Sequence, residues 1–301
     1  MKTISALTKR NISLFFCDKG IFFTSLITPA ILLVLYASFL ANVFSDSLVS
    51  SLPAEITLSD KVVNGYVAGQ VISSILSVSA ITVAFCSNMI MVQDKANKTI
   101  TDLTVSPVNP LHLSISYYIA TLISTLTVCM TALAICLVYA YITGWFLAIS
   151  DILFLILDVF LLVCFGTALS SIINFFLSSQ GQISAVGTIV SSGYGFICGA
   201  YMPISQFSKG LQRVISFFPG TYGTSLVKNH AMRGVFKAME SEGLPTDAID
   251  SIKTVVDCKI KFFDNDVSVP AMLTVLLVSI TVLVSVYVII NFIKYRRRYS
   301  K

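Results

Sequence analysis

The sequence contains few charged residues. Asp, Glu, Lys and Arg make up 12% of its 301 residues, whereas soluble domains carry about 25%. Apolar residues account for 55% of the chain. This balance argues against a large soluble helical protein. The net charge of +5 is small and needs no nucleic-acid partner to explain it.

Several functional motifs are also missing. The chain has no Gly-x-x-x-x-Gly-Lys-[Ser/Thr] motif, so we do not expect it to bind ATP in the usual way. Its seven cysteines show no metal-ligand spacing, and no metal site is predicted. Residues 1–20 lack the continuous apolar core of a signal peptide. We therefore expect neither a cofactor bound by this chain nor an enzyme activity of its own.

What the sequence does contain is a set of apolar runs long enough to cross a bilayer. About 20 residues of α-helix span a hydrocarbon core of ~30 Å. Asp158 is the only charged residue within any run. We therefore predict an all-α polytopic membrane protein with six transmembrane helices. The runs are 21–44, 66–92, 115–143, 152–176, 182–202 and 269–293.

The distribution of Lys and Arg orients the predicted spans. With the N-terminus inside, the inside segments carry eleven Lys and Arg residues, whereas the short outside loops carry only Lys61. Short cytoplasmic loops of membrane proteins hold such an excess of positive charge. We predict a protein of the plasma membrane, specifically of the bacterial inner membrane, with both termini in the cytoplasm. Residues 269–301 then form the sixth span and a basic cytoplasmic tail.

Residues 1–20 are predicted to form a helix that lies along the cytoplasmic membrane surface. Apolar side chains recur near helical spacing there, among Lys9, Arg10 and Asp18. Such a pattern is typical of interfacial helices. A charged flank that retains the first span is the alternative interpretation. Residues 21–202 then hold the first five spans.

The inside loop 93–114 is longer than a simple connector. Helix connections in bundles commonly have about 2–8 residues. Mixed charges, then Leu103 and two prolines, predict a short helix followed by a rigid turn. A long cytoplasmic loop of this kind is a candidate docking element for a soluble partner.

The fifth span has small residues at every fourth position. Gly187, Ser191, Gly195 and Gly199 form one predicted face. Small faces let helix backbones approach closely in lipid. This face either packs within the bundle or lies at a subunit interface or a closable pathway. Leucine at Thr188, off this face, is expected to be tolerated better than leucine on it.

Residues 203–268 are predicted to lie outside. The apolar spacing in 207–218 predicts a short amphipathic helix, ended by Pro219 and Gly220. It is too short to span, so a re-entrant or outer-interface helical hairpin fits best. A small aqueous cap is expected to follow it.

Asp158 lies about 10 Å into the fourth span, given the rise of a helix. A carboxylate is costly inside a membrane and indicates a function by default. The alternatives are that hydroxyls such as Thr125 or Thr127 satisfy it, or that it is protonated.

The order of these features resembles an ABC-2-type permease, the membrane subunit of an ATP-binding-cassette exporter. The chain begins with an amphipathic stretch, which is followed by a first span with Pro29. A long inside loop ending in Ser-Pro-Val and an outer hairpin come later. In this family the inside loop is the coupling helix that docks on the ATPase. Its pattern has Gly-Thr and Glu-x-Leu, where this chain has Lys98-Thr99 and Asp102-Leu103. The resemblance assigns ATPase coupling to Asp94, Lys95, Lys98, Asp102, Leu103 and Pro107.

The resemblance extends to the outer hairpin. Residues 198–204 and 218–222 match the turns at which the family's hairpin opens and closes. The hairpin is expected to gate the exit of a path lined by the first, second and fifth spans. The residues assigned to this outer gate are Tyr201, Pro203, Phe207, Phe218 and Pro219.

An ABC-2-type permease exports its substrate with ATP hydrolysed elsewhere. The resemblance implies two copies of a separate ABC ATPase, which bind ATP and Mg, and a second permease copy or a sister permease. An amphipathic drug, lipid or peptide is the expected substrate. Export of a lipid-linked polysaccharide is the alternative within this class. An ion-coupled secondary transporter using Asp158 and a non-transporting membrane scaffold are alternatives of other classes.

Overall fold

The computed structural model describes residues 2–35, 41–50, 58–105, 108–263 and 265–299, and most of them are helical. The all-α prediction is therefore confirmed, with one small β-hairpin added. The main helices are α1 (Lys2–Cys17), α2 (Lys19–Leu35), α3 (Ala41–Ser50), α4 (Asp60–Ala96), α5 (Thr99–Val105), α6 (Pro110–Thr143), α7 (Ile149–Phe176) and α8 (Gln180–Ile197). They are followed by the short helix η2 (Ile204–Gln206), α9 (Lys209–Ile215), α10 (Pro219–Ser241), α11 (Thr246–Val255), β1 (Ile260–Phe262), β2 (Asn265–Val267) and α12 (Val269–Tyr299).

Four of the described helices are long and apolar enough to cross a membrane: α4, α6, α7 and α12. A fifth candidate is the pair α1 and α2, which meet at a bend of 70°. These helices confirm a polytopic membrane protein. The predicted fifth span corresponds to α8, which has 18 residues and is not among the candidates. The count of six spans therefore stays a prediction, and part of the first predicted span lies outside the described residues.

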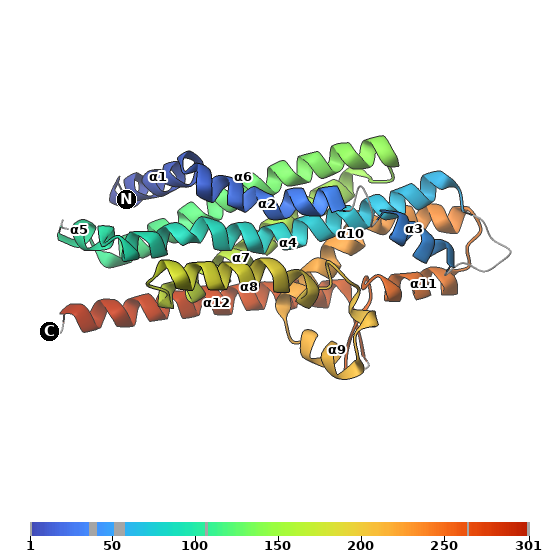
Figure 1. Cartoon of the computed structure of the whole chain (residues 1–301). Coiled ribbons are helices and arrows are strands. Elements are labelled where there is room, and N and C mark those ends of the chain that lie inside the picture. Colours follow the sequence, from blue (N-terminus) through green and yellow to red (C-terminus); the bar gives the residue numbers. More distant parts are fainter. Residues whose placement is uncertain (1, 36–40, 51–57, 106–107, 264, 300–301) are drawn as a thin grey trace.

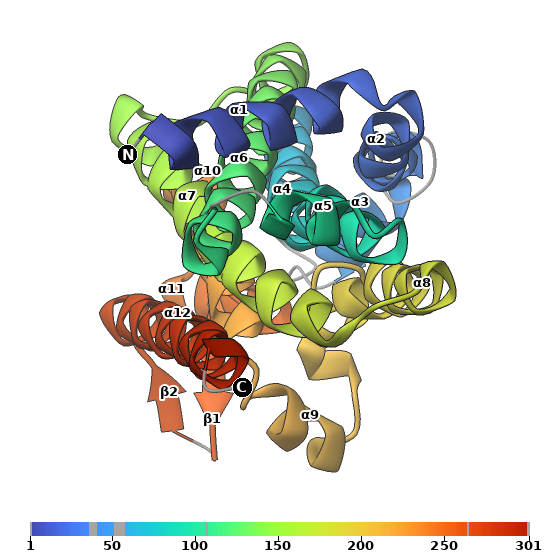
Figure 2. The same cartoon turned by 90° about the vertical axis from the view of Figure 1, so that its left-hand side faces the viewer.

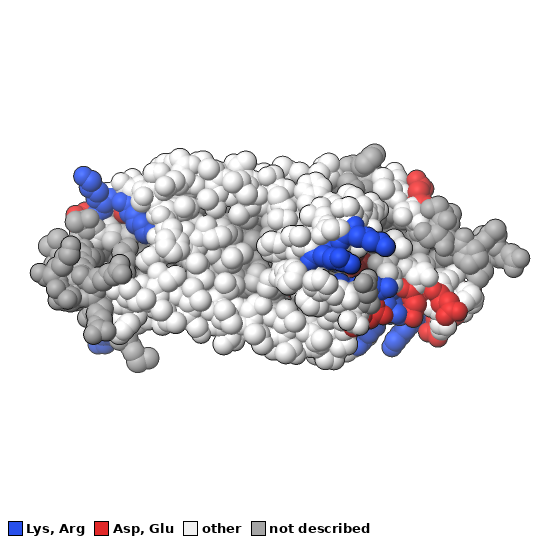
Figure 3. Space-filling model, turned by 90° about the horizontal axis from the view of Figure 1, so that it is seen from below, with Lys and Arg blue, Asp and Glu red and all other residues white. Residues whose placement is uncertain are grey.

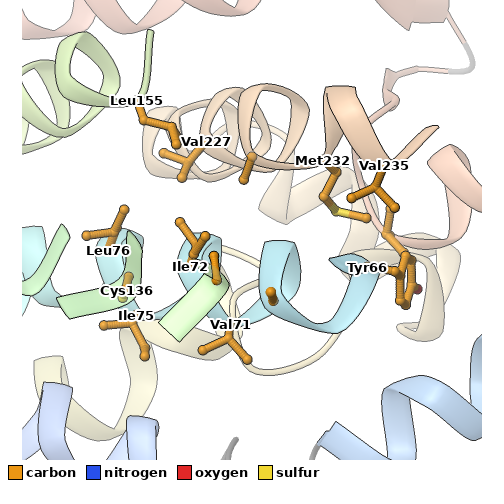
Figure 4. Close-up of a cluster of buried hydrophobic side chains, with 14 of the residues drawn as sticks. Tyr66, Val71, Ile72, Ile75, Leu76, Cys136, Leu155, Val227, Met232 and Val235 are labelled. Carbon is orange, nitrogen blue, oxygen red and sulfur yellow. The ribbon is translucent and has the colours of Figure 1, made fainter. Parts of the chain in front are cut away.

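The long helix α4 forms the centre of the bundle. Its 37 residues extend for about 55 Å. Within its most apolar stretch, 89% of the residues are buried, and α2, α6, α7, α8 and α10 all pack against it. Figure 4 shows Ile72 and Leu76 of α4 opposite Val227 of α10 and Leu155 of α7. Because α4 is covered on nearly every side, it fixes the positions of the surrounding helices.

Both chain termini and α5 lie at one end of the bundle, whereas α3 and α11 lie at the other (Figure 1). We call these the terminal end and the distal end. Figure 3 shows a broad band without charged side chains between charged groups at the two ends. Such a band suits the lipid-facing belt of a membrane protein. Which end faces the cytoplasm stays a prediction.

The region 203–268 differs from its prediction. Pro219 and Gly220 begin α10 instead of ending a helix, because proline at the first helical position loses no hydrogen bond. The first residues of α10, from Gly220 to Lys228, are all buried, and α10 packs on α4, α7 and α12. The first part of α10 is therefore packed within the helix bundle, and the outside placement of residues 203–268 stays a prediction.

Glycine allows a close approach between α4 and α7. A methyl group added at Gly166 of α7 would lie 2.7 Å from the carbonyl oxygen of Ala80. The helices pack backbone to backbone here, as is usual in membranes. No such neighbour exists at Gly193 of α8, where an added methyl group meets nothing within 4 Å.

We predict that Gly166→Ala lowers the stability of the bundle. The added methyl group overpacks the contact between α4 and α7, at a cost of about 1–3 kcal/mol. Thermal unfolding in detergent should show a lower midpoint. Gly193→Ala is the matched control and should not destabilise, because alanine favours a helix by ~1 kcal/mol over glycine. Equal midpoints for Gly166→Ala and the parent protein would contradict the close approach.

Candidate functional site

Asp94 connects three helices near the terminal end. Arg10 of α1 binds it with two hydrogen bonds, from Nη1 to Oδ2 at 2.8 Å and from Nη2 to Oδ1 at 3.1 Å. The Tyr117 hydroxyl of α6 donates to Oδ2 at 2.5 Å. Bidentate Arg–carboxylate pairs are strong and geometrically specific. Asp94 is buried, so in this structure it joins α1, α4 and α6 and is not exposed to a partner.

Lys95 joins α4 to the end of α7. Its ammonium group donates to the backbone carbonyls of Asn174, Phe175 and Leu177 at 2.7–3.1 Å. The last carbonyls of a helix have no partner within the helix, and a cation there also interacts well with the helix dipole. Lys95, predicted as a coupling residue, thus caps α7 within its own chain.

A left-handed residue turns the chain between α4 and α5. Lys98 has a φ of +62°, a conformation that glycine adopts at lower cost than other residues. This is the place at which the coupling-helix pattern has glycine. The backbone turn that glycine favours is therefore present, although the residue differs.

Two of the predicted coupling residues face outward. The side chains of Lys98 and Asp102 are exposed. Leu103 is half-buried and packs on a small apolar cluster that includes Leu7 and Phe15 of α1. Pro107 lies outside the described residues. Of the described residues in the predicted set, Lys98 and Asp102 are thus the ones whose side chains are exposed.

The predicted small face of α8 is turned toward its own chain. A methyl group added at Gly187 would lie 2.9 Å from the Met89 side chain of α4, and one added at Gly195 would overlap the Tyr201 ring. The Ser191 hydroxyl donates to the Gly187 carbonyl. Gly199 lies beyond the end of α8, with a φ of +72°, so the expectation of a four-residue helical face including Gly199 is wrong.

Beside the exposed Ile189 and Phe196, a strip of α8 next to the predicted face is exposed and also carries small residues. These residues are Gly181, Ser184, Thr188 and Ser192. An added methyl group at Gly181 meets nothing within 4 Å. The hydroxyls of Thr188 and Ser192 donate to backbone carbonyls of their own helix. This face, which the sequence interpretation placed off the contact surface, is available for packing between chains.

The predicted gate residues do not all lie together. Tyr201 folds back onto α8, where its hydroxyl donates to the Ser191 carbonyl and its ring contacts Phe196. Pro203 and Phe207 flank the short helix η2. Two predicted gate residues come later: Phe218 is exposed and caps α10, and Pro219 is its first residue.

Asp158 pairs with a residue that the sequence interpretation placed outside. Its Oδ2 lies 2.5 Å from Nδ1 of His230 in α10. The His230 ring stacks on Phe154 at 4.8 Å. Two turns nearer the start of α7, Asp151 pairs with Arg233 at 2.6 Å. The expectation that hydroxyls of the third span satisfy Asp158 is not met, because α10 supplies the partner.

A second buried ion pair holds the turn after α8. Lys228 of α10 donates to the Gly199 carbonyl at 2.8 Å and to Oδ2 of Asp257 at 3.2 Å. Asp257 also accepts the backbone N–H of Ile204 at 2.9 Å. Lys228 is almost completely buried. The sequence interpretation did not single out this pair.

No group of three or more His, Cys, Asp or Glu side chains is placed to hold a metal ion within the part of the chain that the structure describes. The described contacts instead link helices: α1 to α4 and α6 at the terminal end, and α10 to α7 and to the turn after α8 farther along the bundle. The arrangement is that of a helical bundle whose helices are joined by buried polar contacts.

Comparison with known proteins agrees with this arrangement. A family model described as ABC-2 family transporter protein matches residues 48–293. No curated protein matches the chain. The match includes α4, α6, α7, α8, α10 and nearly all of the apolar part of α12. Because it covers well over half of the sequence, the chain belongs to the ABC-2 family of transporter proteins.

Proposed function

We propose that this chain is the permease subunit of an ATP-driven exporter of the ABC class. A separate ATPase, present in two copies, binds ATP and Mg and hydrolyses the ATP. The permease lies in the plasma membrane, of the bacterial inner-membrane kind, with six spans and with its terminal end in the cytoplasm. Family membership supports the permease assignment.

The arrangement at the terminal end is the observation that carries this proposal. α5 follows α4 through the left-handed turn at Lys98 and presents Asp102 at the surface. α1 lies at the same end (Figure 1), and Arg10 binds it to α4 through Asp94. A force applied to α5 or α1 is therefore transmitted directly to the central helix α4. This is the mechanical connection that an ATP-driven permease needs, because its own sequence has no phosphate-binding motif.

A second permease copy completes the pathway in this proposal. One bundle leaves α8 with an exposed face of small residues, and such faces pack closely in lipid. A C2 dimer through this face is the simplest assembly, since two-fold dimers are the commonest oligomers. A sister permease with a similar face is the alternative. The second span, α4, is buried within its own chain and offers little surface to such a path.

An amphipathic drug, lipid or peptide is the substrate class that we favour. A cavity of about 490 Å³ lies between α1, α2, α4 and α6, with Phe22, Pro29 and Ile75 in its wall. The hydroxyls of Thr127 and Thr131 in this wall already donate to carbonyls of their own helix. An apolar group fits this lining better than a sugar, whose hydroxyls need free hydrogen-bonding partners. A lipid-linked polysaccharide remains the second candidate.

An ion-coupled carrier that uses Asp158 is the alternative of another class. The contact of Asp158 with His230 favours a structural role, because the carboxylate already has a close partner and the His230 ring is held by Phe154. In the exporter, this pair connects α7 to α10.

We predict that Asp102→Ala reduces ATPase activity that depends on the permease. The exposed carboxylate lies in the first turn of α5, at the proposed docking surface. The measurement is ATP hydrolysis by the co-purified complex in proteoliposomes. Asp247→Ala is the matched control, because Asp247 is also an exposed acid in the first turn of a short helix, but at the distal end. An equal effect of the two substitutions would contradict docking at α5.

We predict that Thr188→Leu disrupts pairing of two permease chains. The larger side chain separates two closely packed α8 helices without touching the fold of one chain. Cross-linking in membranes measures the pairing, and thermal unfolding measures the stability of the chain. Gly195→Leu should behave differently, since it overlaps Tyr201 and lowers the stability of the single chain. Undiminished pairing of Thr188→Leu chains would place the interface elsewhere.

We predict that Asp158→Asn retains transport driven by ATP. Asparagine preserves a hydrogen bond to His230 while removing the charge. Uptake into inverted vesicles that contain the ATPase measures the activity. If transport by this chain alone is driven by an ion gradient and is lost in Asp158→Asn, the carrier alternative is correct and the exporter proposal is wrong.

A further inference from the structure

Three phenylalanines from distant parts of the chain form an exposed aromatic cluster. Phe217 follows α9, whereas Phe262 and Phe263 come from β1 and the turn after it. Their ring centroids lie 5.5, 5.8 and 4.9 Å apart, all in edge-to-face geometry. Such geometry is favourable for aromatic pairs. The contacts therefore hold α9 and the β-hairpin together as one platform.

This aromatic cluster is open on its outer side. Phe217 is 62% exposed and Phe263 is 49% exposed. Leu211 and Val214 of α9 add further exposed apolar surface beside it. A contiguous exposed apolar patch on a folded protein marks an interaction site, in contrast to single scattered side chains. The question is which partner covers it.

The position of the hairpin along the bundle identifies the partner. β2 ends at Val267, and α12 begins only two residues later at Val269. Only 11% of the residues in the apolar stretch of α12 are buried within the chain, and an exposed apolar helix surface of this length suits contact with lipid. The hairpin is thus fixed at the level where this lipid-facing surface begins. The aromatic cluster continues the lipid-facing surface of α12 toward the distal end.

The platform also projects sideways from the bundle. Figures 1 and 2 show α9 beyond the neighbouring helices, at the level of the distal end of α12, and Figure 2 shows the hairpin beside it. An element that projects sideways at this level meets the boundary between lipid headgroups and acyl chains. At the distal end of α6, the exposed Tyr141 and Trp145 form a second pair of aromatic side chains. Aromatic residues of this kind are enriched at membrane–water boundaries.

Basic side chains lie on the same elements as the aromatic cluster, with Asp266 directly across the hairpin from Lys261. Lys209, Arg213 and Lys261 are exposed, and the Arg213 guanidinium lies over the Phe263 ring at 5.9 Å. Figure 3 shows Lys and Arg atoms gathered where the uncharged band of the surface ends. Long basic side chains keep their apolar stems in the boundary and their charges in the headgroup layer. This combination fits lipid phosphates and acyl chains.

We propose that the aromatic cluster of α9 and the β-hairpin inserts into the lipid leaflet at the distal end and anchors this platform at the headgroup–acyl boundary. The acyl chains cover the three rings, and the basic side chains contact lipid phosphates. The anchor fixes the height of α9 relative to the bilayer. The Gln212 side chain of α9 donates hydrogen bonds to the carbonyls of Ser205 and Phe207. The anchor on α9 therefore also restrains the segment around η2 that follows α8.

Tryptophan fluorescence tests this proposal in the full-length protein. Trp145 is the only tryptophan, so Trp145→Phe provides a silent background. Phe217→Trp and Phe263→Trp are then placed separately in this background, with Glu240→Trp as an exposed control at the distal end of α10. Each variant is reconstituted into phosphatidylcholine nanodiscs with or without bromine on the acyl chains. Aqueous iodide is the second quencher.

The proposal predicts that both Phe→Trp variants lose emission in brominated lipid, emit at shorter wavelength than Glu240→Trp, and resist iodide. Glu240→Trp should show the reverse. Quenching of both Phe→Trp variants by iodide alone would overturn the proposal and leave the cluster in water. Protection from both quenchers would also overturn it, because a protein surface would then cover the cluster. Each substitution replaces one aromatic ring by another, which keeps the disturbance of the fold small. Because two separate positions are tested, the result does not depend on the folding of a single variant.

Discussion

The burial of α4 is the constraint on which the other helices depend. A lipid environment gives apolar helices little drive to associate, so contacts must come from close packing and from buried hydrogen bonds. α4 provides both. Gly166 of α7 approaches its backbone closely, and Asn88 of α4 donates to the hydroxyls of Ser170 and Ser171. Once these contacts are made, the neighbouring helices can turn only their remaining faces to lipid or to another chain.

The terminal end of α4 converts this packing into a mechanical connection. Asp94 and Lys95 are adjacent in sequence but bind in different directions, Asp94 to Arg10 of α1 and Lys95 to the last carbonyls of α7. Removing one partner of a buried ion pair is costly, because the other charge loses its compensation. α1, α4 and α7 are therefore expected to move together when a partner acts on this end.

Much of the architecture could be predicted from the sequence, because long apolar runs have a direct meaning in a membrane. They located α4, α6, α7 and α12, and the length of loop 93–114 located α5. The interpretation failed at α10, since Lys228, His230 and Arg233 make this helix look water-soluble. Each of these three side chains has an acidic partner between 29 and 82 residues away. No local pattern encodes such pairs. The sequence left two alternatives open for α8: small residues occupy neighbouring strips of this helix, and only the positions of Met89 and Tyr201 show which one turns inward.

These pairs also restrict how an exit can open. Lys228 holds the carbonyl of Gly199, and its partner Asp257 holds the N–H of Ile204, so the turn after α8 is bound to α10. Breaking such a buried pair costs about 3–5 kcal/mol. His230 in turn connects α10 to Asp158 of α7. The turn cannot swing freely as a separate lid without losing these contacts. In the proposed pair of permease bundles, movement is cheaper between the two rigid bundles, along the exposed side of α8, where no contact within one chain has to break.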